Sequence, residues 1–482
     1  MLFTRLPVAH AASPLLCVVL PFLLSSLVQA AEVTLNSTVE TTATLSDNID
    51  LQPRDRQSSG LVWTQNFGID MRAEGAHSNL AVDGTLNLDT IFNDGTEVDL
   101  RPDMVALGQT ELVNGLLFLD GGVSWQRQPI APDTKLSATT GFSRNETTQV
   151  FQVNLSPTLR SRLGDYAKGE LRYRYARNFI ASDAIQETEV NQQFAALQSD
   201  RQLYPVRLTL TGERTDATTG GDGDLKQLTA TLRTEYALSP RRVLIGIVGY
   251  DDIGGNAVEA DLGGPVVAMG FRLQPGPQTQ IEATAGYRYG RSNLQGLLRQ
   301  HITERIQAVA SYSSFLETPL EASGSGGLTI DPETGQIVNA ITRLPLNFAV
   351  PGLRLEETAS LTDRLDMALI GTFGRTTASV GVRWERRDFA TDPDERLAAI
   401  LLRLEHQLTS RFTVGLEGNY RRTQSQDELA PLNSALVRTS LNYEIGRSLV
   451  GYAAYSRNQR FSDTSEKEYA ENAVLIGLRM TF

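Results

Sequence analysis

Arginine and glutamate alternate with apolar residues in several segments of the chain. In "LRYRY", Leu171–Tyr175, one tyrosine separates two arginines. A guanidinium group can donate paired hydrogen bonds to carboxylates or hydroxyl groups, so such rows can bind an anionic or sugar-like solute, or set the charge selectivity of a channel. The same rows can instead be ion pairs that bind no ligand. The candidate lumen-lining residues are Arg172, Arg174, Arg207, Arg233, Arg288, Arg305, Arg383, Arg387, Arg421, Arg438, Glu235, Glu385 and Glu417.

Residues for catalysis are sparse. The chain has 4 histidines and 1 cysteine, and it contains no HExxH, CxxC or GxSxG stretch. A barrel hydrolase would need a serine–histidine pair held by a third polar group. His301 and His406 are candidates for that alternative only because they are histidines. We therefore predict a protein that is not an enzyme, with no catalytic residue, cofactor or metal site.

The charged rows require elements that send neighbouring residues to opposite faces. In "IEATAGYRYG", Ile281–Gly290, Tyr287 and Tyr289 share an apolar and aromatic face, whereas Glu282 and Arg288 share the other. The same period of two recurs at 206–213, 228–238, 380–387, 412–421 and 437–445. A period of two indicates β-strands with two unlike faces.

These strands fit a membrane barrel better than a soluble sandwich. Segments of about ten residues alternate through most of the chain, their non-lipid face is strongly polar, and short links such as 238–241 alternate with long polar ones such as 130–145. Aromatic residues gather near strand ends, as interfacial girdles do. We predict an all-β, closed antiparallel transmembrane β-barrel of about 18 strands, with 16–20 open, at roughly 25 residues per strand and connection. The barrel is expected over 60–482.

The first thirty residues have the pattern of a secretory signal peptide. Arg5 lies in a short start, 11–28 is almost wholly apolar, and Val28 and Ala30 supply small residues before a cut. We expect cleavage after Ala30, with an uncleaved membrane anchor as the alternative. Residues 31–59 are then an N-terminal leader that includes a possible first strand.

The chain ends on an amphipathic segment, "ENAVLIGLRMTF". In Glu471–Phe482, Val474, Ile476, Leu478 and Met480 alternate with less apolar residues. A membrane barrel has no open edge, so 471–482 is predicted to close the barrel against the first strand. The terminal Phe482 resembles the signal read by the bacterial barrel insertion machinery.

The formal net charge of −12 argues against a nucleic-acid partner, because phosphate binding needs a basic face. The expected partners are outer-membrane lipid and the barrel insertion machinery. The expected location is the outer membrane of a Gram-negative cell, as a multi-pass barrel.

Three segments resemble one family. They are "TATLSDNIDLQP" at Thr42–Pro53, "ELVNGLLFLDGGVSWQRQ" at Glu111–Gln128, and the closing stretch Ser456–Phe482. These resemble the outer-membrane β-barrel proteins associated with exopolysaccharide and PEP-CTERM gene clusters, the porin-like family of capsule biosynthesis. The poorest match is Leu316–Leu361, which looks like an insertion or a remodelled loop.

The resemblance implies a porin-like channel in exopolysaccharide or capsule export, with polysaccharide and periplasmic export proteins as partners. A general or solute-specific diffusion porin, a non-conducting scaffold of an export complex and a barrel hydrolase stay open as alternatives. The solute, the direction of transport, the oligomeric state and an open or plugged lumen are not decided by the sequence.

Overall fold

The structure is a computed structural model. It describes residues 30–131, 133–182, 186–200, 204–220, 223–256, 258, 262–318, 328–331, 336–340, 342–343, 358–390, 393–426 and 430–482. The expected signal peptide lies, apart from Ala30, outside the described residues. Across the described ranges, no helix has the length and apolar character needed to span a membrane.

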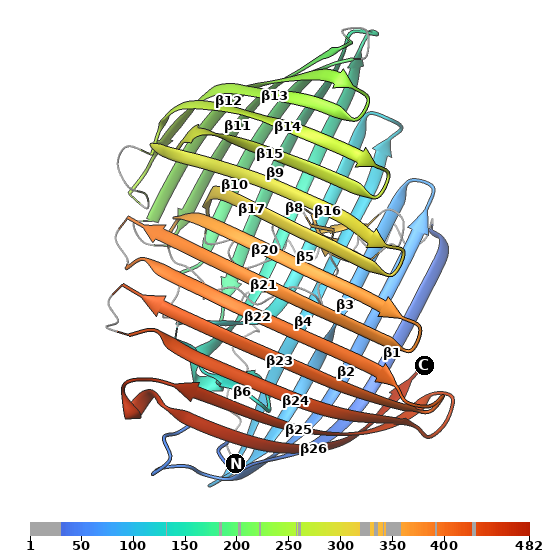
Figure 1. Ribbon diagram of the computed structural model, residues 1–482, viewed down its shortest axis with the longest axis vertical. Helices are drawn as coiled ribbons and strands as arrows, with labels where there is room; N and C mark the ends of the chain where they lie inside the picture. The colour runs from blue at the N-terminus through green and yellow to red at the C-terminus, as the bar shows by residue number, and fades with distance from the viewer. Residues whose placement is uncertain are drawn as a thin grey trace.

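Twenty-two strands form one antiparallel sheet that closes on itself (Figure 1). The first and last strands pair directly, with Thr38 opposite Thr481 and Ser46 opposite Ala473. Closure leaves no strand edge unpaired, as the interior of a bilayer demands. The strands are β1 (Ala30–Ser46), β2 (Gly60–Gly75), β3 (Ser78–Phe92), β4 (Thr96–Val113), β5 (Leu117–Pro129), β8 (Thr147–Leu163), β9 (Ala167–Ile180), β10 (Thr188–Ser199), β11 (Val206–Thr219), β12 (Gly223–Ser239), β13 (Arg242–Gly254), β14 (Gly264–Gly276), β15 (Thr279–Arg288), β16 (Arg291–Thr303), β17 (Ile306–Glu317), β20 (Ser360–Phe373), β21 (Thr376–Phe389), β22 (Glu395–Gln407), β23 (Phe412–Ser425), β24 (Leu432–Glu444), β25 (Leu449–Phe461) and β26 (Tyr469–Thr481).

The predicted fold class is confirmed, but the strand number is 22 and not about 18. The estimate assumed connections that are too long. Pro240 and Arg241 are the whole link between β12 and β13, and Tyr289 and Gly290 are the whole link between β15 and β16. Such tight turns fit more strands into the same length of chain.

The two ends of the barrel differ in their connections. At one end, here called the turn end, the links are short, and β1 begins and β26 ends there. At the other end, here called the loop end, the links include 130–146 and 318–359. Because outer-membrane barrels have short periplasmic turns and longer extracellular loops, the loop end faces the outside of the cell.

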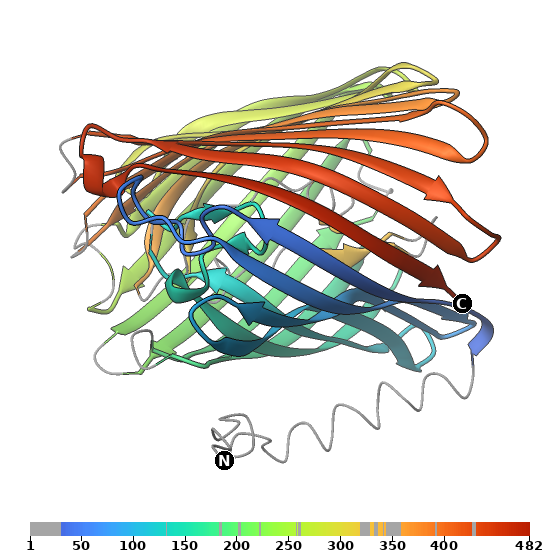
Figure 2. The same cartoon turned by 90° about the horizontal axis from the view of Figure 1, so that it is seen from below.

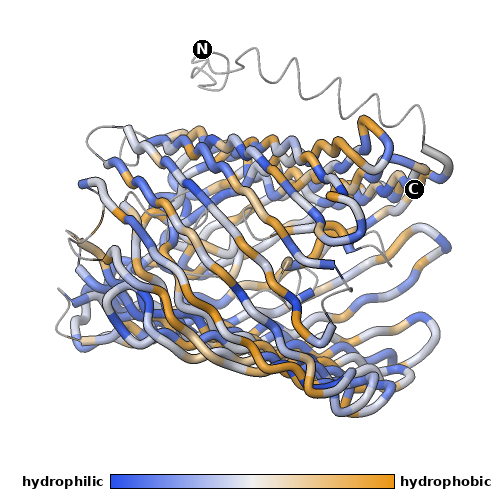
Figure 3. Tube along the Cα trace, turned by 90° about the horizontal axis from the view of Figure 1, so that it is seen from above, coloured by the Kyte–Doolittle hydropathy of each residue, from blue (hydrophilic) through white to orange (hydrophobic). Residues whose placement is uncertain are grey.

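The outer surface of the barrel is apolar. Large apolar side chains are exposed on most strands and alternate with less exposed residues. Hydrophobic and hydrophilic positions also alternate along the trace in Figure 3. On β26 the exposed residues are Val474, Ile476, Leu478 and Met480, the set predicted to face lipid. A closed barrel with an apolar outer face is an outer-membrane protein.

The first strand lies within the segment expected to be a leader. β1 pairs with β2 along its length and with β26 near its end. The barrel therefore begins at Ala30–Ser46, before the boundary at residue 60 that the sequence suggested.

Phe482 ends the chain beside β1, at the rim of the turn end. Its amide donates to the Ser37 carbonyl at 2.9 Å, and its ring is 65% exposed.

We expect Phe482→Ala to lower the amount of barrel in the outer membrane severalfold while leaving the stability of the assembled fraction nearly unchanged, because an exposed ring adds little packing. Quantifying heat-modifiable protein in outer-membrane fractions measures this, with Phe461→Ala as control; an unchanged amount would remove Phe482 from the insertion signal.

Candidate functional site

The inner wall of the barrel carries twelve of the thirteen predicted residues. Strand parity places each opposite an exposed apolar neighbour, as Arg172 between Leu171 and Tyr173 illustrates. Sequence alternation therefore predicts their direction well. The twelve are Arg172, Arg174, Arg207, Arg233, Glu235, Arg288, Arg383, Glu385, Arg387, Glu417, Arg421 and Arg438.

Arg305 was predicted wrongly. It lies with Glu304 in the exposed turn between β16 and β17, at the turn end. The alternation continues through this tight turn in the sequence, so parity alone does not reveal that the strand has already ended.

A charge network spans the inner face of β11 to β15. Arg233 lies 2.9 Å from Glu235 and 2.8 Å from Glu282. Arg272, which the sequence analysis missed, contacts the same two carboxylates at 2.9 and 2.8 Å. Arg272 has the parity opposite to that of exposed Met269 on the same strand, so alternation in the sequence would have placed it on the inner wall. Each carboxylate is thus shared by two guanidinium groups, and Arg207 approaches Glu235 at 3.8 Å, so this wall is largely self-neutralised.

A second interior pair lies near the loop end. Arg288 contacts Asp251 at 2.7 Å and stacks on the Tyr289 ring at 4.6 Å. Tyr289 was expected to face lipid with Tyr287, but it has a φ of 56° and is buried. With Gly290 it forms a tight turn with positive φ at both residues, which redirects the ring into the interior, where burial raises the pKa of its hydroxyl.

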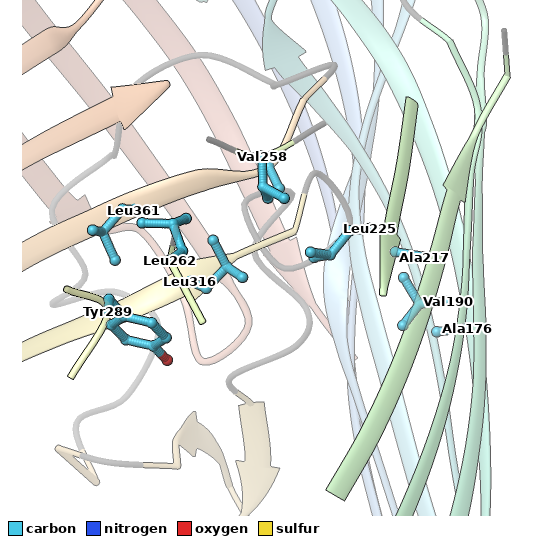
Figure 4. Packing of buried hydrophobic residues seen from close by; sticks show 10 residues of the cluster. Ala176, Val190, Ala217, Leu225, Val258, Leu262, Tyr289, Leu316 and Leu361 are labelled. Carbon is cyan, nitrogen blue, oxygen red and sulfur yellow. The ribbon is translucent and has the colours of Figure 1, made fainter. Parts of the chain in front are cut away.

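Apolar side chains surround Tyr289 at this end. Leu316 and Leu361 belong to the same buried cluster, together with Val258 and Leu262 from the connection between β13 and β14 (Figure 4). This connection therefore packs against the barrel wall.

A buried charge network lies on β17, β20 and β21. Arg364 donates to Glu317 at 2.8 Å and to Glu385 at 2.9 Å. Arg387 lies 2.8 Å from Glu385 and 3.7 Å from Glu317. We expected Glu385 and Arg387 to line a hydrated lumen, but they are only 0% and 1% exposed. Alternation gives the direction of a side chain and not what covers it.

Arg421 is a buried cation of this region that has no hydrogen-bond acceptor among the residues that the structure describes. It points inwards from β23, is 5% exposed, and none of its three guanidinium nitrogens has a hydrogen-bond partner. The positive charges of Arg460 and Arg387 repel that of Arg421, whereas the carboxylates of Glu385 and Glu395 attract it. An unpaired buried cation is costly, so this position favours an added anion.

The connection between β5 and β8 folds back into the barrel. It contains β6 (Leu136–Ser137), β7 (Gly141–Phe142) and the 3-10 helix η2 (Arg144–Glu146), and Figure 2 shows it inside the ring of strands. The Leu136 carbonyl accepts from Tyr469 Oη at 2.9 Å and from Asn458, and the Glu471 carboxylate accepts from the Ala138 amide at 2.7 Å. This connection is therefore anchored to the inner wall of β25 and β26.

The connection between β17 and β20 also enters the lumen. Its described part includes the hairpin of β18 (Leu328–Ile330) and β19 (Ile337–Asn339). Ile330 and Ile337 pack on Ala81, Val105 and Leu107, which are inward residues of β3 and β4 nearer to the turn end. The hairpin, which belongs to the segment that looked like an insertion, thus reaches from the loop end deep into the barrel.

His406, a candidate of the hydrolase alternative, lies on the outer face of the barrel and not on the lumen wall. His406 lies on the lipid-facing parity of β22, and its Nδ1 is 2.7 Å from Thr376 Oγ1. Within the described ranges, no group of three or more histidine, cysteine or acidic residues has a geometry that could hold a metal ion.

No family model and no curated protein matches this chain. Solved structures match it at low identity. The siderophore receptor PirA from Acinetobacter baumannii is 11% identical, with 93% of this chain and 80% of that chain covered and a TM-score of 0.46. The FrpB iron transporter from Neisseria meningitidis is 11% identical, with 95% and 84% covered and a TM-score of 0.46. At such identity the similarity concerns the fold, and it assigns no ligand to the residues above.

Proposed function

We propose that this protein is an outer-membrane channel for an anionic polar solute, with an acidic exopolysaccharide as the substrate class. Its lumen is narrowed by the connection 130–146 and by the hairpin of β18 and β19, and passage involves no chemical step. The observation that carries the proposal is Arg421, an inward, buried guanidinium with no hydrogen-bond acceptor within the described ranges.

A carboxylate group of the solute would supply the hydrogen-bond acceptor that Arg421 lacks. The cross-strand row through Arg421 continues to Arg383 on one side and Arg460 on the other, through the pairings with Ala399 and Ser434. Arg383 is already paired with Asp366 at 2.7 Å. Arg421 and Arg460 are therefore the cations of this row that favour a carboxylate over a neutral solute. The carbonyl of Asp133 already accepts from Arg460 at 2.6 Å, so the connection 130–146 lies where it competes with an entering anion.

Polysaccharide rather than a small anion is supported by the family resemblance of the opening, middle and closing segments. Twenty-two strands enclose a wide interior, and its in-folded connections come from loops, which can be displaced. The channel is thus narrow, but open to small ions, until a polymer enters. A diffusion porin would share the lumen but not the preference for a polymer.

Current block by sugar polymers tests this proposal. In planar bilayers, oligomers of polygalacturonate should block the wild-type current at concentrations about tenfold lower than neutral dextran oligomers of the same length. Arg421→Gln should remove most of that difference, because it removes the charge-assisted bonds. Arg305→Gln, in the exposed turn, is the matched control.

Equal block by acidic and neutral oligomers would contradict the choice of an anionic solute. Normal surface polysaccharide in a strain lacking the protein would remove the export role and leave a diffusion porin. A strain that loses surface polysaccharide although the purified protein conducts no current would favour the scaffold.

A further inference from the structure

Three arginines project outwards at the loop end of adjacent strands. Arg386 on β21 pairs directly with Arg396 on β22. Arg422 on β23 lies diagonally from Arg396, two residues before Gln424, which is the direct partner of Arg396. All three share the parity of exposed lipid-facing residues on their own strands, such as Trp384 and Tyr420. They form an outer arginine patch, defined as Arg386, Arg396 and Arg422.

The patch is only partly neutralised by the protein. Arg386 contacts Asp388 at 2.7 Å, and Asp388 also contacts Arg291 at 3.1 Å. Arg396 and Arg422 are exposed, and neither forms an ion pair with any residue that the structure describes. Arg386 also lies directly opposite Asp363 on β20. Like charges directly opposite each other destabilise a sheet, so an added anion beside Arg396 and Arg422 would stabilise the pairing of Arg386 with Arg396.

The patch lies at a defined depth in the membrane. Trp384, Ile400 and Tyr420 are exposed outward residues on the same three strands, each nearer to the turn end than the arginine of its strand. Exposed aromatic residues mark the boundary of the hydrocarbon region. The arginines therefore lie just beyond this boundary, at the level of the headgroups of the outer leaflet.

We infer that the outer arginine patch binds the phosphate groups of an anionic glycolipid of the outer leaflet. Guanidinium groups bind phosphate oxygens in pairs, and basic clusters at the membrane surface recognise anionic headgroups. The tryptophan and isoleucine below the patch contact the acyl chains of the same lipid. This site is on the outside of the barrel and is independent of the lumen and its solute.

Binding of a defined lipid tests the site. Detergent-purified protein is incubated with diphosphorylated lipid A or with the same lipid after enzymatic removal of its phosphates, and bound lipid is counted by native mass spectrometry. The wild type should bind the phosphorylated form about tenfold more tightly. Arg396→Gln with Arg422→Gln should lose that preference, and each single variant should lose part of it.

The control is Arg242→Gln with Arg411→Gln, which removes two exposed arginines at the turn end. It should bind as the wild type does, and heat-modifiability on gels checks that every variant is folded. The inference is overturned by a folded Arg396/Arg422 variant, single or double, that keeps the wild-type preference. It is equally overturned by a wild type that does not distinguish the two lipids, or by a control that loses binding to the same extent.

Discussion

Replacing Glu385 by glutamine is expected to destabilise the barrel by about 3–5 kcal/mol, because it breaks a buried ion network by removing one partner. Glu385 is fully buried and lies 2.9 Å from Arg364 and 2.8 Å from Arg387. The isosteric amide keeps the shape but leaves these guanidinium groups with Glu317 as their remaining carboxylate. Equilibrium unfolding of the folded protein in urea, followed by loss of strand signal, measures the change.

Glu417→Gln is the matched control. Its partner Arg403 lies 3.8 Å away, and both side chains are 38% exposed. An exposed pair contributes about 0–1 kcal/mol, so the free energy of unfolding of the control should be close to that of the wild type. If Glu385→Gln also unfolds within that margin, the network does not stabilise the barrel.

Removing the connection 318–359 is expected to raise single-channel conductance about twofold or more, because conductance follows the water-filled cross-section of the lumen. Glu317 and Ser360 are direct cross-strand partners, so an Asn-Gly turn can join β17 to β20 without moving the strands. The variant loses the hairpin that packs on Ala81 and Val105, and planar-bilayer recording measures the result.

A shorter deletion, in an exposed connection, controls for replacing a loop-end connection by a tight turn. Residues 462–468, which contain the 3-10 helix η5 (Ser465–Lys467), join β25 to β26 and are mostly exposed. Replacing them by the same turn should leave the conductance near that of the wild type. Conductance that is equal in all three proteins would mean that 318–359 does not obstruct the lumen.

Alternation in the sequence predicts the direction of side chains because it is a property of the strand itself. Arg172 and Arg421 could be placed on the inner wall from their exposed neighbours Tyr173 and Tyr420 alone. The same rule applied to 267–273 would have added Arg272. The closing strand could be predicted for the same reason, since an amphipathic end has to pair with another edge.

Features that depend on tertiary contacts could not be predicted in this way. Tyr289 turns inwards because a two-residue turn changes the sign of φ, and Arg305 leaves the wall because a strand ends. Glu385 and Arg387 are buried rather than hydrated. The anchoring of 130–146 by Asn458 and Glu471 joins residues more than 300 positions apart, and no local pattern signals it.

Ion conductance by the purified wild-type protein is the most direct test of the central claim that the barrel encloses a charged, water-filled passage. The protein should be heat-modifiable on gels, which shows that it is folded, and should then be inserted into planar bilayers in plain salt solution. The account predicts discrete, reproducible current steps. Folded protein that inserts into the bilayer and yet never conducts would contradict it.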